Sequence, residues 1–200
     1  YMPSTYKTFL IATVAIAGIP PLAGFFSKDE VLAMTMNAGL ADGGSWVYMM
    51  LWGVGIITAF LTAFYMFRLT LTTFHGSFKL PTKIKEAVGA EKFLHENPWN
   101  MTTPLWILAI LAIFGGFLGV PNFIVETFTH EPAHINLLHD WLYKINADYI
   151  IEMEHWVEWV LMAVSILIAI SGVWLAFRMY NNDQQEESDA KIASRFGGLY

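Results

Sequence analysis

Three consecutive charged residues, Lys28, Asp29 and Glu30, stand in an otherwise apolar part of this sequence. A charge at the centre of a bilayer costs at least ~2.5 kcal/mol, so residues of this kind usually serve a function. A partly desolvated lysine loses its proton more readily, whereas a neighbouring carboxylate restores its affinity for the proton. The trio therefore predicts ion exchange at Lys28, modulated by Asp29, with Glu30 as a further polar group. The spacing leaves proton or sodium open.

The residues before this trio predict a broken helix. Residues 18–24 read Gly-Ile-Pro-Pro-Leu-Ala-Gly, and Pro20 and Pro21 each lack a backbone donor. We expect two half-helices, at about residues 4–18 and 25–37. Irregular backbone at membrane depth requires protein or a water-filled cavity around it. A purely structural interpretation is that Ser27 caps the second half-helix and that an acidic neighbour neutralises Lys28.

The composition indicates a membrane protein. Of 200 residues, 56% are hydrophobic and 14% are charged, against about 25% charged residues in soluble domains. The net charge of −6 argues against nucleic acid as a partner, and the absence of cysteine excludes thiolate metal sites. Both ends lie in sequence that looks structured, so we expect a piece of a longer polypeptide.

Four apolar segments predict an all-α, polytopic transmembrane bundle. The first span is broken at Pro20-Pro21, and the others cover about 46–74, 99–120 and 155–180. The resulting units are a first unit, a connector, two additional spans with an external loop at 121–154, and a tail, at residues 1–75, 76–98, 99–180 and 181–200. Lysine and arginine counts place the N-terminus, the 75–98 connector and the tail in the cytoplasm.

Other polar residues are weaker candidates. Thr58, Thr62 and Tyr65 share one face of the second span, which predicts a water-lined path or contact with a partner helix. Arg68 and His75 are minor candidates near the end of that span. A zinc-hydrolase pattern occurs at residues 130–134, His-Glu-Pro-Ala-His, but its proline opposes the regular helix that the pattern requires. We expect no metal site.

Residues 19–32, Ile-Pro-Pro-Leu-Ala-Gly-Phe-Phe-Ser-Lys-Asp-Glu-Val-Leu, resemble the antiporter-like subunit L (chain 5) family of respiratory complex I, the proton-pumping NADH:quinone oxidoreductase. Residues 65–68, 74–76 and 194–200 add to the resemblance. It implies an inverted-repeat fold in which residues 1–75 end the second repeat and the tail leads into a lateral helix. The broken-helix lysine and aspartate of the family map onto Lys28 and Asp29, on the exit half of a proton path.

The resemblance also implies a function. The chain would translocate protons in the membrane arm of an enzyme whose NADH, FMN, iron–sulfur clusters and quinone are bound by other subunits, without redox chemistry of its own. Its partners would be other membrane-arm subunits and the lipid bilayer, most naturally a bacterial inner membrane. Because Pro-Pro-x-x-Gly-Phe also fits cation/proton antiporters of the Mrp type, that function is an alternative, as is a purely structural membrane module.

Overall fold

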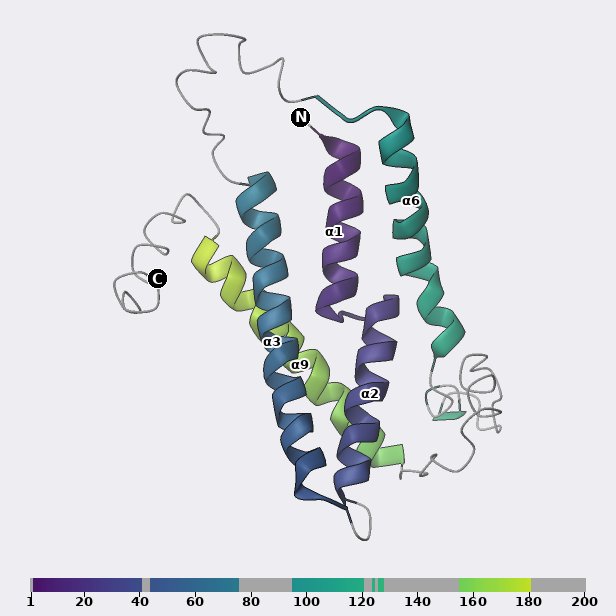
Figure 1. Ribbon diagram of the computed structural model, residues 1–200, viewed down its shortest axis with the longest axis vertical. Coiled ribbons are helices and arrows are strands. Elements are labelled where there is room, and N and C mark those ends of the chain that lie inside the picture. The colour runs from purple at the N-terminus through teal and green to yellow at the C-terminus, as the bar shows by residue number, and fades with distance from the viewer. Residues whose placement is uncertain are drawn as a thin grey trace.

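A computed structural model of the protein describes residues 2–40, 44–75, 95–120, 124, 126–127 and 155–180. Within these residues every regular element is helical (Figure 1). A π-helical turn, η1, continues α3, and a 3-10 turn, η2, continues α6. The elements in order are α1 (Pro3–Ala17), α2 (Ala23–Leu40), α3 (Trp46–Thr70), η1 (Leu71–His75), α6 (Trp99–Phe114), η2 (Gly115–Gly119) and α9 (His155–Tyr180). The predicted all-α class is thereby confirmed.

Three of the described helices are long and apolar enough to cross a membrane. They cover Trp46–His75, Trp99–Gly119 and Trp156–Tyr180, with mean hydropathies of 1.9, 2.0 and 2.5. These helices coincide with the second, third and fourth predicted spans. Helices α1 and α2 follow one another along the long axis of the bundle, with a sideways offset at the break (Figure 1). The protein is an all-helical integral membrane protein.

Helix α9 crosses behind α3 in Figure 1, and small side chains bring the two helices close together. A Cβ atom built on Gly172 of α9 would lie 2.7 Å from the backbone oxygen of Phe60 in α3. Small residues at helix interfaces are the usual means of tight packing in membranes, because they let two backbones approach. The adjoining buried cluster joins α1, α3 and α9 through Ala17, Ala63, Phe67 and Ala176.

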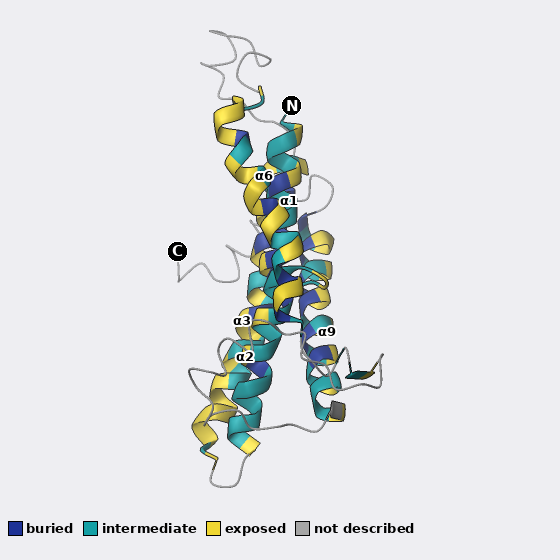
Figure 2. Cartoon of the chain, turned by 90° about the vertical axis from the view of Figure 1, so that its right-hand side faces the viewer, coloured by how far each residue is buried: buried dark blue, intermediate teal, exposed yellow. Residues whose placement is uncertain are grey.

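The outward faces of the helices are apolar and exposed (Figure 2). Trp46 and Leu61 of α3 are 70% and 52% exposed, and Leu108 of α6 is 62% exposed. In water such surfaces would favour aggregation, whereas in a membrane they meet acyl chains or neighbouring helices. The pattern of exposure therefore agrees with the composition.

Glu96, which precedes α6, holds the start of α1. Its carboxylate accepts a hydrogen bond of 2.7 Å from the Ser4 backbone N–H and one of 2.6 Å from the Thr5 hydroxyl. The first turn of α1 contains no acidic residue, and its N-cap, Met2, makes no side-chain cap. Glu96 thus supplies from 92 residues away the negative charge that a helix N-terminus favours.

Glu96→Gln is expected to loosen the first turn of α1. The hydrogen bond from Thr5, together with those from backbone N–H groups, lowers the pKa of Glu96. A lowered pKa stabilises the folded state above the ordinary value of about 4.3 and loses that effect as the pH falls through the lowered value. Hydrogen exchange at pH 7 should be several times faster in residues 3–8 of the variant. The exposed neighbour His95 provides the control, His95→Ala, which should leave exchange unchanged.

Candidate functional site

The break between α1 and α2 begins at Gly18. Its φ of 71° is left-handed, a conformation that glycine adopts without steric cost. The Gly18 N–H bonds to the Ala15 carbonyl at 3.1 Å and the Ile19 N–H to the Val14 carbonyl at 3.3 Å, which together form a Schellman motif. Pro20 then prevents continuation of α1. The predicted broken helix is confirmed.

The second half-helix begins earlier than the sequence suggested. Helix α2 starts at Ala23, so Ser27 lies inside it, and the prediction that Ser27 is an N-cap is wrong. Its hydroxyl instead donates to the carbonyls of Ala23 and Gly24, at 3.4 and 3.5 Å. Ala23 is a strong helix former, and no proline follows Pro21 to delay the helix. The charged trio therefore occupies the second turn of α2.

Lys28 reaches back to the end of α1. Its Nζ donates to the carbonyl of Ala17 at 3.3 Å and to that of Gly18 at 3.5 Å. A cation at a helix C-terminus is stabilised by the carbonyls that have no partner within the helix. A Cβ atom at Gly18 would overlap this ammonium group. The lysine therefore bridges the two half-helices, and the glycine makes room for it.

Asp29 points toward a different helix. It interacts electrostatically with Lys28 beside it and with the side chain of Ser165 in α9. One turn earlier on α2, Phe25 packs against Met162 of α9 in a buried cluster. Asp29 is thus held at the interface of α2 and α9, and its carboxylate remains near the lysine.

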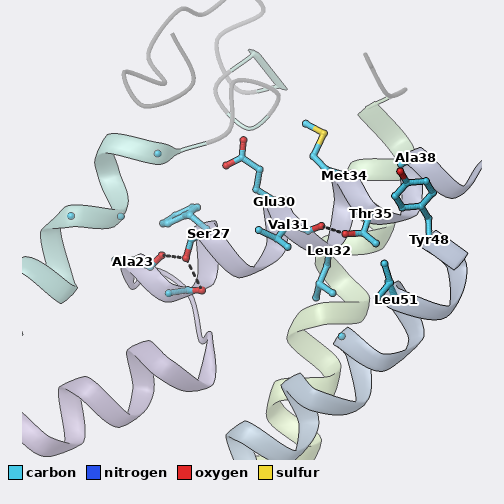
Figure 3. A pocket seen from close by; sticks show the side chains of 16 residues that line it. Ala23, Ser27, Glu30, Val31, Leu32, Met34, Thr35, Ala38, Tyr48 and Leu51 are labelled. Atoms are coloured by element: carbon cyan, nitrogen blue, oxygen red, sulfur yellow. Dashed lines mark hydrogen bonds between the residues drawn. The ribbon is translucent and has the colours of Figure 1, made fainter. Parts of the chain in front are cut away.

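Glu30 lines a third surface, a groove of about 990 Å³ between α2, the start of α3 and η2 (Figure 3). Ser27 and Thr35 contribute hydroxyls to this largely apolar groove. Successive residues of a helix are turned by about 100°, which explains why adjacent charges meet separate surroundings. The three charges therefore do not form one cluster: Lys28 contacts α1, Asp29 contacts α9 and Glu30 faces the groove.

Sequence comparisons place this site in a known setting. Over the whole chain, the sequence is 36% identical to the NAD(P)H-quinone oxidoreductase chain 5 of Picosynechococcus sp. and to that of Synechocystis sp., covering 29% and 31% of those proteins. It is 33% identical over 90% of the chain to the NADH-quinone oxidoreductase subunit L of Mycobacterium tuberculosis, covering 24% of that protein. The chain thus spans less than a third of the length of these relatives.

Two family models divide the chain within α3. Residues 1–62 match the model described as NADH:quinone oxidoreductase/Mrp antiporter, TM, which fits both of the transport functions considered above. Residues 59–196 match a model of the transmembrane C-terminus of an NADH dehydrogenase (complex I) subunit. The chain belongs to the complex I subunit L (chain 5) family. Within this family, Lys28 and Asp29 lie in the antiporter-like part, whereas α9, which contacts Asp29, lies in the C-terminal part.

The second group of predicted residues lies apart from this site. Thr58 and Tyr65 are exposed on α3, and the Thr58 hydroxyl donates to the Val54 carbonyl of its own helix at 2.8 Å. Thr62 is half-buried. A water path along this face remains a prediction that requires elements outside the described residues to cover it.

The two minor candidates have aromatic partners. The Arg68 guanidinium lies 5.0 Å from the ring centre of Tyr180, a cation–π contact between α3 and α9. The His75 Nε2 lies 3.4 Å from the Tyr6 hydroxyl, and the two rings pack edge to face. Both contacts join helices, which fits the interfacial roles that the sequence favoured. The zinc-hydrolase pattern at 130–134 lies outside the described residues.

Proposed function

We propose that this chain forms part of a proton-translocating subunit in the membrane arm of complex I, with Lys28 as the proton-exchange group and Asp29 as its modulating partner. The observation that carries this proposal is the position of the Lys28 ammonium against the C-terminal carbonyls of α1, 3.3 Å from that of Ala17. Two independent features, the end of α1 and the Asp29 carboxylate, act on the lysine. A shift of either half-helix or of Asp29 changes how tightly the lysine holds its proton.

The proposed topology has four spans, the first formed by α1 and α2. Residues 1–75 end the second of two inverted repeats, 76–98 form a cytoplasmic connector, 99–180 contain two additional spans around an external loop at 121–154, and 181–200 lead into a lateral helix. The N-terminus and the tail lie in the cytoplasm, and the membrane is a bacterial inner membrane. The family membership and the broken helix support this arrangement.

The redox chemistry takes place elsewhere in the proposed complex. The chain contains no cysteine, the residue that ordinarily ligates iron–sulfur clusters. NADH, FMN, the clusters and quinone would bind to other subunits, and the exposed apolar faces of α3 and α6 would contact lipid or other membrane-arm subunits. Glu30, in its groove, would contribute to the polar surroundings of the exit route.

NADH-driven proton transport is expected to proceed in sodium-free medium. Inverted membrane vesicles containing the assembled enzyme should acidify on addition of NADH, with the membrane potential collapsed to remove any secondary ion movement. If the family's Mrp branch described this protein better, proton movement would instead need an imposed sodium or potassium gradient and would not respond to NADH. A purely structural module would leave transport unchanged when the lysine is replaced.

A further inference from the structure

The inner face of α9 carries one hydroxyl in an otherwise apolar stripe. The stripe recurs at intervals of three and four residues, which places its members on one side of the helix. Ser165 is 1% exposed, as deeply buried as its neighbour Ala169. The members of the stripe are Met162, Ser165, Ala169, Gly172 and Ala176.

The Ser165 hydroxyl is unusual because no atom of the described residues meets it in hydrogen-bond geometry. A serine inside a helix ordinarily donates to a carbonyl three or four residues earlier, as Ser171 of the same helix does to Ile168 at 2.7 Å. Leaving a buried hydroxyl without a partner costs about 1–3 kcal/mol. Alanine at this position would pack equally well without that cost.

The group that Ser165 faces is the carboxylate of Asp29, with which it interacts across the interface of α2 and α9. The backbones are fixed here by Phe25 of α2 and Met162 of α9, one turn from these polar residues. A rotation of the Asp29 side chain, or one intervening water, is enough to join the hydroxyl to the carboxylate.

We propose that Ser165 is a positioning residue for Asp29, which donates its hydroxyl to the ionised carboxylate and thereby fixes the distance between that carboxylate and Lys28. This inference rests on the proposed proton exchange at Lys28. It gives the C-terminal part of the chain a direct role at the exchange site, because α9 lies within residues 59–196, which match the complex I C-terminal model.

The test is Ser165→Ala in the full-length subunit of the assembled complex. We expect proton pumping per NADH oxidised to fall about threefold in the share carried by this subunit, the order of effect for one modest hydrogen bond. The amount of assembled complex should not fall, since alanine removes only an unpaired buried hydroxyl. Ser165→Thr, which retains the hydroxyl, should restore pumping. Ser171→Ala, the matched exposed serine on α9, should leave it unchanged.

A double substitution separates positioning from packing. In an Asp29→Asn background, Ser165→Ala should have no further effect, because the group that it positions is already altered. Additive losses, or normal pumping in Ser165→Ala while Asp29→Asn is impaired, would overturn the role of Ser165 and leave the proposed function intact. Normal pumping in Asp29→Asn and Lys28→Ala alike would overturn the proposed function itself.

Discussion

Replacing Lys28 with alanine is expected to slow proton transfer through this subunit by about 10²-fold, the lower end of what removal of a positioned acid–base group costs. The reason is that no other ammonium group among the described residues lies at the break, where Nζ of Lys28 contacts the carbonyls of Ala17 and Gly18. The measurement is the number of protons translocated per electron in closed membrane vesicles, with assembly followed in parallel.

Lys28→Arg decides between exchange and mere bridging. Arginine keeps a positive charge for the end of α1, but it does not release its proton at any physiological pH. If Lys28 only ties the half-helices together, the arginine variant should pump nearly as well as the wild type. If Lys28 exchanges protons, the arginine variant should fail as severely as the alanine variant while assembling better. Lys7→Ala, at an exposed position of α1, is the matched control and should pump normally.

The broken helix was predictable because its causes are local. Pro20 and Pro21 exclude helical hydrogen bonds whatever surrounds them, and the glycine at position 18 supplies the left-handed residue that ends α1. The start of α2 was less predictable, because Ser27 suits a cap as well as an interior position. Its hydroxyl bonds back to Ala23 and Gly24, and the stronger helix former at position 23 decides where the helix begins.

The partners of the charged trio could not be predicted from the sequence. Spacing suggested that a neighbouring acid neutralises Lys28, whereas its hydrogen bonds go to backbone carbonyls of another helix. Contacts between distant segments have no local signal, and the buried bond of 3.0 Å between Thr13 and Thr70 is of the same kind. Ser165 did leave a signal, because it interrupts a regular stripe of apolar and small residues, but its neighbour Asp29 became evident only from the packing of α2 on α9.

Gly172→Ala is expected to destabilise the crossing of α3 and α9 by about 1–3 kcal/mol, the usual cost of overpacking a close contact. The added Cβ would lie 2.7 Å from the Phe60 backbone oxygen and 3.0 Å from the Ala63 Cβ. Backbone atoms cannot rotate away as a flexible side chain can, so the helices must separate. Because α9 also packs against Asp29, separation should reduce proton pumping as well as thermal stability.

Gly53→Ala is the matched substitution on α3. A Cβ atom at Gly53 would have no atom within 4 Å among the described residues, and alanine favours a helix over glycine by about 0.5–1 kcal/mol. The midpoint of heat inactivation of the assembled enzyme should therefore fall for Gly172→Ala and stay level or rise for Gly53→Ala. Equal midpoints for the two variants would mean that α3 and α9 tolerate a wider separation, and that the close crossing is not what keeps α9 against the exchange site.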